Sequence, residues 1–150
     1  LAQQGELITH HKDKAALSRL SIRELIETNF KTIGPEANLG DLVKIIAQSQ
    51  RNVFPVIDNE NTFLGVVFLN DIMHILFNRE LYKKTLVRNL MFMPDTLVQL
   101  HETMEDVAQK FQSTSHYNLP VLDGAKYVGF VSRANVFSAY RKLVKEFSQD

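Results

Sequence analysis

The sequence contains no cysteine. Disulfides, thiolate catalysis and zinc–thiolate sites are therefore excluded together, and the composition fits a reducing compartment. The sequence also lacks an excess of positive charge, because 17 lysine and arginine residues balance 17 aspartate and glutamate residues. Without a positive field to attract a phosphate backbone, general nucleic-acid binding is disfavoured. We expect no nucleic-acid partner.

Long hydrophobic runs are also missing. The longest apolar run, residues 63–69, is far too short to span a bilayer, so we expect a soluble chain with no direct membrane insertion. The chain begins with Leu1 and shows no signal-peptide pattern, so we expect it to be part of a longer protein.

Catalytic and metal-binding patterns are absent as well. The sequence has no Walker-type glycine loop and no recognisable arrangement of serine, histidine and acid. His10 and His11 are adjacent, and adjacent residues of a helix point about 100° apart, so they do not suggest a shared metal ion. We therefore expect no catalytic residue, no metal site, no required cofactor and no enzymatic activity.

An internal repeat is present instead. With 150 residues, of which 45% are hydrophobic, the chain can bury a core as one domain or as two small ones. Residues 22–58 align without a gap with residues 87–123 at an offset of 65, and after the next turn the offset falls to 64, so that Gly65 aligns with Gly129. Two copies indicate a pseudo-symmetric pair rather than a solenoid.

Each repeat predicts the same order of elements: strand, helix, strand, strand, helix. In the first repeat Asn38 is the expected N-cap of a helix that ends near Gln50; in the second, Thr103 and Asp106 suggest a capping box. Two strands follow, the first containing a proline, which we expect at an edge or facing away from a partner. The closing helices are predicted at 71–77 and 134–147. The expected fold class is α+β (α/β), with two pseudo-symmetric units, each having a small three-stranded sheet and flanking helices.

The predicted domain boundaries follow from these repeats. Residues 1–20 form an N-terminal linker or helix from an upstream domain, 21–78 the first unit, and 86–147 the second unit. Residues 79–85, which overlap the polar string "NRELYKK" at 78–84, join the two. Neither unit is large enough to form a stable hydrophobic core alone, so we expect the two to pack together.

A repeated motif links this sequence to a known family. The strings "FPVID" and "LPVLD", each followed by a turn and by an apolar strand with a glycine, resemble the CBS domain. Two in tandem resemble a CBS pair, or Bateman module. The resemblance implies a regulatory module, often with a cleft between its halves that takes adenosine-containing ligands, and often paired with a second copy.

Longer strings resemble one branch of the family. "SQRNVFPVIDNENTFLGVVFLNDI", "FNRELYKKTLVRNLM" and "KYVGFVSRANVFSAYRKLVKEFS" together resemble the C-terminal cytoplasmic CBS pair of bacterial CLC-type chloride channels and transporters, and "THHKDKA" resembles the connection from their last membrane helix. The resemblance implies a transmembrane chloride channel domain upstream, a position on the cytoplasmic side of the inner membrane, and a homodimer formed through the CBS units.

The resemblance also suggests ligand-binding positions. In the family, a hydroxyl and an acid after the glycine lie where a strand passes into the closing helix, and they can bind a ribose. The first repeat has Phe68 and Asp71 at these positions, whereas the second has Ser132 and Asn135. Each repeat therefore matches in part, and Phe68 would narrow a pocket beside it. The second repeat is the better candidate, with Arg133 as a phosphate partner.

The residues before each proline-containing strand form the other wall in the family. Arg51 and Asn52 correspond to His116 and Tyr117, and an arginine plane or a tyrosine ring could stack on adenine. The candidate residues for binding ATP, ADP or AMP are Arg51, Asn52, Asp71, Tyr117, Ser132, Arg133 and Asn135. An alternative without a ligand explains the same residues as helix caps and solvated side chains.

Three functions remain open at this point. The first is a regulatory CBS pair of a CLC-type channel or transporter that modulates gating through adenine nucleotides and dimerisation. The second is a structural dimerisation module with no ligand, whose clefts are filled by Phe68 and its neighbours. The third is a nucleotide-sensing CBS pair attached to another transporter or to an enzyme.

Overall fold

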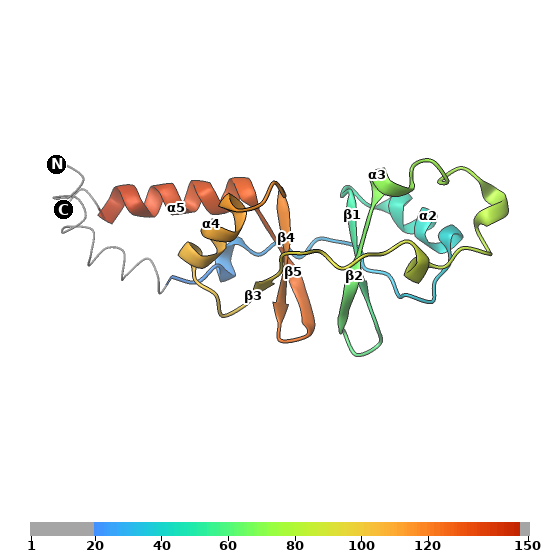
Figure 1. Ribbon diagram of the computed structural model, residues 1–150, viewed down its shortest axis with the longest axis horizontal. Coiled ribbons are helices and arrows are strands. Elements are labelled where there is room, and N and C mark those ends of the chain that lie inside the picture. The colour runs from blue at the N-terminus through green and yellow to red at the C-terminus, as the bar shows by residue number, and fades with distance from the viewer. Residues whose placement is uncertain (1–19, 148–150) are drawn as a thin grey trace. The chain divides into compact units, whose positions relative to one another are not determined.

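A computed structural model describes residues 20–147, and these form two compact units (Figure 1). The first unit contains Thr28–Asp95 and Gly124–Gly129. The second unit contains residues 20–27, Thr96–Asp123 and residues 130–147. The linker or helix expected at residues 1–20 and the adjacent histidines lie outside the described residues, except for Leu20.

The compact units do not coincide with the sequence repeats, because the two repeats exchange their first segments. The N–H of Met104 at the start of the second repeat's helix donates to the carbonyl of Leu20 at 2.8 Å. The equivalent N–H, that of Leu39, donates to the carbonyl of Thr85 at 2.8 Å. The start of each repeat's helix is therefore hydrogen-bonded to the segment at which the other repeat begins.

The exchanged segments continue to the second strand of each unit. Glu27 pairs with Phe130, with N···O distances of 2.7 and 2.9 Å, and Phe92 pairs with Val66, with distances of 2.9 and 3.0 Å. Glu27 and Phe92 are equivalent at the offset of 65, and Val66 and Phe130 are equivalent at 64. The pseudo-symmetry seen in the sequence thus extends to individual backbone hydrogen bonds.

The first unit has two helices and a hairpin. Its elements are α2 (Leu39–Gln48), β1 (Val53–Ile57), β2 (Phe63–Phe68) and α3 (Leu69–Ile72), with 3₁₀ turns η2 (Arg79–Leu81) and η3 (Val87–Asn89). Asn38 and Asp41 form the capping box of α2, so the predicted N-cap is confirmed. The buried core of this unit comprises Ile33, Leu39, Leu42, Phe54, Val56, Val67, Ile72, Leu76 and Val87.

The second unit has a longer closing helix. Its elements are η1 (Arg23–Leu25), β3 (Val98–Gln99), α4 (Met104–Gln112), β4 (Asn118–Asp123), the end of β5 (Lys126–Ser132), whose residues up to Gly129 belong to the first unit, and α5 (Arg133–Phe147). The capping box predicted for Thr103 and Asp106 is confirmed at α4. Figure 1 shows α4 and α5 side by side, and their apolar faces include the buried residues Val107, Phe111 and Val136.

The two sheets differ in their third strand. In the second unit β3 pairs with β4 in parallel, giving the order β3-β4-β5, and the N–H of Leu100 extends this pairing to the carbonyl of Leu122 at 2.8 Å. In the first unit Ile33 makes a single parallel bridge to Val56, and β1 and β2 form a two-stranded sheet. The residue equivalent to Leu100 is Pro35, which has no N–H to donate, so the ladder stops.

The prolines within the strands fit this arrangement. Pro55 lies in β1, at the edge of its two-stranded sheet, and its carbonyl accepts the N–H of Ile33 at 3.1 Å. Pro120 lies in the central strand β4 rather than at an edge. The parallel ladder begins where Val98 pairs with Val121. This ladder therefore does not require an N–H from Pro120.

The closing helix of the first repeat is shorter than predicted. Instead of 71–77, α3 covers Leu69–Ile72. The chain then continues in tight turns, with Leu76 bonded to the carbonyl of Met73 and the hydroxyl of Tyr82 donating to the carbonyl of Leu76 at 2.7 Å. With these bonds the side chain of Leu76 lies in the core, and they take the place of the hydrogen bonds of a longer helix.

Gly65 allows the exchanged segment to approach β2. Its φ of +153° is a conformation that favours glycine, and a Cβ at this position would lie 2.7 Å from the carbonyl oxygen of Phe92. A residue with a side chain could not take its place without a shift of the exchanged segment.

Candidate functional site

The end of β5 carries the predicted hydroxyl. Ser132 is the last residue of β5, and its Oγ accepts the N–H of Asn135 at 3.1 Å. This bond caps α5, because it satisfies an N–H of the first turn that has no partner within the helix. The Ser132 hydroxyl hydrogen can still be donated elsewhere, so capping and ligand binding are compatible.

Asn135 lies in the first turn of α5 and joins a third polar residue. Its Nδ2 donates to Oε2 of Glu27 at 3.3 Å. Asn135 is exposed and Glu27 is partly buried. The side chains of Glu27, Ser132 and Asn135 therefore form one polar group at the end of β5, which we call the β5 polar group.

Arg133 is engaged by the end of α4. Its Nη1 donates to the carbonyls of Phe111, Thr114 and His116, at 2.5, 3.2 and 3.3 Å. Its guanidinium carbon also lies 5.9 Å from the centroid of the Phe111 ring. Nη1 of this cation thus satisfies carbonyls at the C-terminal end of α4, where the helix dipole favours positive charge.

Tyr117 precedes β4 and presents its ring to solvent. The side chain is 78% exposed. Its backbone carbonyl accepts the N–H of Arg133 at 2.8 Å, which holds the residue beside the start of α5. An exposed ring held next to a polar group can stack on a flat base. In the second unit the structure thus brings Tyr117, Ser132 and Asn135 into one region.

The remaining candidates belong to the first unit. The guanidinium carbon of Arg51 lies 4.3 Å from the centroid of the Phe30 ring, and its Nη2 donates to Oδ1 of Asn29 at 2.6 Å. Burial raises the pKa of the nearby Tyr127 hydroxyl, and the positive charge of Arg51 opposes that shift. The arginine plane that was predicted to stack on adenine is stacked on Phe30.

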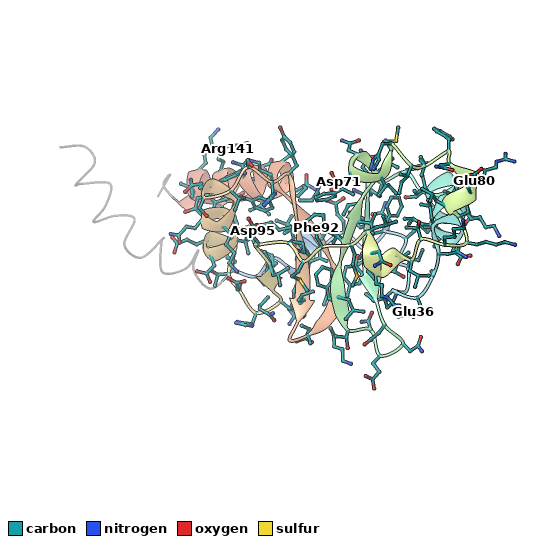
Figure 2. The ribbon with its side chains drawn as sticks, turned by 45° about the vertical axis from the view of Figure 1, so that its right-hand side comes forward. Glu36, Asp71, Glu80, Phe92, Asp95 and Arg141 are labelled. Atoms are coloured by element: carbon teal, nitrogen blue, oxygen red, sulfur yellow. The ribbon has the colours of Figure 1, made fainter. Side chains whose placement is uncertain are left out.

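Asn52 and Asp71 occupy the start of the closing helix in the first unit. The carbonyl of Asn52 accepts the N–H of Leu69 at 2.8 Å, which is the counterpart of the bond between Tyr117 and Arg133. Asp71 is exposed on α3, where Figure 2 labels it. The N-cap position of α3 is Phe68, which makes no side-chain capping bond. Asp71 is therefore a first-turn acid and not a cap.

An aromatic pair replaces the polar group at the end of β2. Phe68 packs against Phe92 with ring centroids 5.1 Å apart, and the two rings are 38% and 40% exposed. These are the positions of Ser132 and Glu27 in the second unit. Figure 2 labels Phe92, which lies in the segment that pairs with β2. Phe68, which was expected to narrow a pocket beside it, thus packs against the ring of Phe92.

Sequence reasoning missed Glu27 and Phe92. Both lie inside the repeated region, where the offset of 65 aligns an acid with an aromatic residue. That mismatch was a usable signal. It could not be interpreted without the exchange of first segments, because only the exchange places Glu27 beside Asn135 of the second repeat.

The β5 polar group offers hydrogen bonding without a metal. Among residues 20–147, no group of three or more histidine, aspartate or glutamate side chains is placed to hold a metal ion.

Within the same residues, no helix combines the length and apolar composition needed to cross a bilayer. The carboxylate of Glu27 and Oδ1 of Asn135 can accept from neighbouring hydroxyl groups, as in a ribose diol, and Ser132 can donate.

Comparison with known proteins agrees with the repeat. The CBS domain family matches the chain twice, at residues 22–78 and 87–142. No curated protein matches the sequence.

Solved structures share the fold. CBSX2 from Arabidopsis thaliana is 23% identical, with a TM-score of 0.66 over 84% of this chain and 97% of that one. CBSX2 in complex with AMP is 26% identical, with a TM-score of 0.66 over 83% and 98%.

Two further similar structures come from membrane proteins. The CBS domain of a membrane protein from Sphaerobacter thermophilus is 16% identical, with a TM-score of 0.68 over 89% of this chain and 96% of that one. The CBS domain of a bacterial CNNM/CorC family Mg²⁺ transporter is 18% identical, with a TM-score of 0.67 over 90% and 83%.

Proposed function

Because this chain belongs to the CBS domain family and carries two CBS domains in tandem, we propose that it is the cytoplasmic regulatory module of a CLC-type chloride channel or anion transporter. The tandem pair and its α+β fold class are confirmed, whereas the CLC parent rests on the long strings that resemble that branch. The membrane proteins among the similar structures support a transporter parent in general.

The ligand of the module is an adenine nucleotide, bound at the end of β5. The observation that carries this proposal is the β5 polar group beside the exposed ring of Tyr117. Three polar side chains can bind a ribose, and the ring can stack on the base. The AMP complex of CBSX2 supports the choice of ligand.

The nucleotide acts by shifting a conformational equilibrium. A ligand that binds one arrangement of the module more tightly than another favours that arrangement by its differential affinity, typically about 1–3 kcal/mol. In the full-length protein this free energy changes the balance between the open and closed states of the channel or transporter.

The phosphates contribute little to the affinity. The guanidinium of Arg133 is engaged by three carbonyls, and two N–H groups in the first turn of α5 are bonded to Tyr117 and Ser132. Nη1 of the cation and two N–H groups of the helix terminus, which could otherwise bind a phosphate, are thus already engaged. We expect AMP, ADP and ATP to bind within a few-fold of one another.

Thermal unfolding of the chain with AMP, ADP and ATP tests nucleotide binding. At a ligand concentration a hundred times the dissociation constant, the free energy of unfolding should rise by about 2.7 kcal/mol. Ser132→Ala should reduce this gain, whereas Ser138→Ala, an exposed position further along α5, should not. Melting curves that do not move at millimolar nucleotide would remove the nucleotide-sensing function.

Ion flux tests the parent protein. The full-length protein reconstituted in liposomes should conduct chloride, and millimolar AMP should change the flux unless Ser132 is replaced by alanine. Transport of magnesium instead of chloride would show that the parent is another kind of transporter. A soluble catalytic domain upstream would show that the parent is an enzyme.

Dimerisation without a ligand is a second candidate function. The observation that favours it is the set of exposed apolar side chains in the first unit: Phe68, Met73, Phe77, Phe92 and Met93. This function predicts a concentration-dependent dimer in analytical ultracentrifugation and no response to nucleotide. Phe77→Ser, at a side chain that is 81% exposed, should then weaken the dimer without lowering the stability of the fold.

A further inference from the structure

Two apolar side chains are exposed in the segment that follows β2. Met73 is 49% exposed and Phe77 is 81% exposed, whereas Ile72 and Leu76, the residues directly before them, are buried. Because positions four apart lie on one face of a helical turn, Ile72 and Leu76 anchor the segment in the core while Met73 and Phe77 face solvent. An exposed apolar pair on a fixed support is typical of an interaction surface.

Hydrogen bonds hold this segment in place. The N–H of Leu76 donates to the carbonyl of Met73 at 3.3 Å, and the hydroxyl of Tyr82 donates to the carbonyl of Leu76 at 2.7 Å. The carbonyl of Tyr82 in turn accepts the N–H of Gly40 in α2 at 3.1 Å. These bonds bring the η2 turn, and the residues that follow Tyr82, back toward Phe77. The exposed ring of Phe77 therefore belongs to an ordered part of the first unit.

Positive charge accompanies the apolar pair. Arg79, Lys83 and Lys84 are exposed. Glu80 is the single acid within residues 73–84, so three cations and one acid give this segment a net charge of +2. The apolar and cationic side chains together form what we call the α3–η2 surface: Met73, Phe77, Arg79, Lys83 and Lys84.

The second repeat shows that the fold does not require this surface. At the offset of 64, Met73 aligns with Phe137 and Phe77 aligns with Arg141. The ring centroid of Phe137 lies 6.4 Å from that of Phe111, and Arg141 is exposed. The exposed apolar pair is thus specific to the first repeat, which favours a function for it.

We propose that the α3–η2 surface binds the surface of an anionic phospholipid bilayer. Met73 and Phe77 enter the headgroup layer, and the three cations bind lipid phosphates, so the segment lies on the bilayer and does not cross it. Charge distinguishes this occupant from a second copy. The chain has no net charge to offer the cations, whereas an anionic bilayer offers negative charge and an apolar layer together. The proposal depends neither on nucleotide binding nor on the transported ion.

Co-sedimentation with vesicles of phosphatidylcholine and phosphatidylglycerol tests this contact. The chain should bind them, and raising the salt from about 50 mM to about 500 mM should weaken binding because it screens the lysines. Lys83→Gln with Lys84→Gln should reduce the partition coefficient about thirtyfold at low salt. Arg141→Gln with Lys142→Gln is the charge-matched control, because it removes two adjacent exposed cations from α5, and it should change binding little.

Fluorescence reports the contact at the apolar pair itself. Phe77→Trp introduces the single tryptophan of the chain, and its emission should shift to shorter wavelength when anionic vesicles are added. Tyr117→Trp, at another exposed ring, is the control, and its emission should not move. Phe77→Ser should bind the vesicles about tenfold more weakly than wild type.

Several results would overturn the proposal. Wild-type chain could fail to sediment with anionic vesicles, or could bind vesicles of phosphatidylcholine alone equally well. Equal losses of binding in the two charge variants would also exclude a specific surface. An emission shift of Phe77→Trp that grows with protein concentration and needs no lipid would assign the surface to a second copy. Because Lys83 and Lys84 are exposed, their variant keeps the core intact and tests the proposal even if a Phe77 variant does not fold.

Discussion

The end of β2 and the end of β5 are equivalent positions of a repeated fold, yet they carry opposite chemistry. At the end of β2 two aromatic rings pack together, and at the end of β5 a hydroxyl, an amide and a carboxylate are linked by hydrogen bonds. The backbone bonds around the two ends are the same within 0.3 Å, for example 2.7 Å from Glu27 to Phe130 and 3.0 Å from Phe92 to Val66. The difference teaches that the fold fixes the positions of these side chains, while their chemistry is left to each repeat.

The largest expected effect comes from opening the backbone contact at the end of β2. Gly65→Ala places a Cβ 2.7 Å from the carbonyl oxygen of Phe92 and forces a strained φ, so it should lower the free energy of unfolding by about 3 kcal/mol. Urea denaturation measures this loss. Gly124→Ala is the control, because its φ is +64° but nothing lies within 4 Å, and it should cost about 1 kcal/mol. Equal losses would mean that the contact with Phe92 is unimportant.

Removing the cation at the end of α4 should have the next largest effect. Arg133→Leu introduces the residue that the first repeat carries at this position, Leu69, and leaves three carbonyls without their donor. Because hydrogen bonds to a charged group contribute about 1.5–3 kcal/mol, we expect a loss of about 2 kcal/mol in urea denaturation, partly recovered in Arg133→Lys. Unchanged stability together with lost AMP affinity would instead identify Arg133 as a phosphate partner.

Transplanting the polar group into the first unit should produce a smaller change in stability and a new activity. Phe68→Ser with Phe92→Glu and Asp71→Asn removes an aromatic pair at a cost of about 1 kcal/mol and supplies the hydroxyl, the carboxylate and the amide of the second unit. Calorimetry should then show two AMP molecules bound per chain in place of one. Phe68→Ser alone keeps Phe92 and should still bind one. Two molecules bound to wild type would show that the aromatic pair does not close the first site.

The smallest expected effect is a pH dependence in the turn after β1. The N–H groups of Thr62 and Glu60 donate to Asp58 at 2.8 and 2.9 Å, and the Thr62 bond is the main reason that the pKa of this carboxyl is lowered. A lowered folded-state pKa stabilises the fold above the unfolded value near 4, and this contribution is lost as the pH falls through the folded value. Wild type should therefore exceed Asp58→Asn in stability at pH 7, with the gap closing toward pH 3.

Urea denaturation across this pH range, with Asp123→Asn in the second hairpin as the charge-matched control, measures the effect. A gap between wild type and Asp58→Asn that stays constant from pH 7 to pH 3 would contradict it.

Much of the fold could be predicted because the relevant signals are local. The N-cap at Asn38 and the capping box at Thr103 were predicted because these signals lie within a few residues of the helix start. The length of α3 could not be predicted, since it depends on the hydroxyl of Tyr82 reaching the carbonyl of Leu76. Likewise, the resemblance to the CBS domain implied a ribose-binding position at Ser132, but the engagement of Arg133 by the end of α4 depends on contacts with Phe111 and its neighbours in space.

The sequence by itself determined that this protein is a tandem pair of CBS domains, because a repeated pattern of apolar residues, prolines and glycines constrains local backbone geometry twice in the same way. The sequence also favoured the second repeat as the polar one, and only the tertiary structure decided which distant residues join each end. The exchange of first segments brings Glu27 to Asn135, 108 positions apart in the chain, and Phe92 to Phe68. The physical reason is that backbone pairing between distant segments sets these neighbours, and no local spacing records such a pairing.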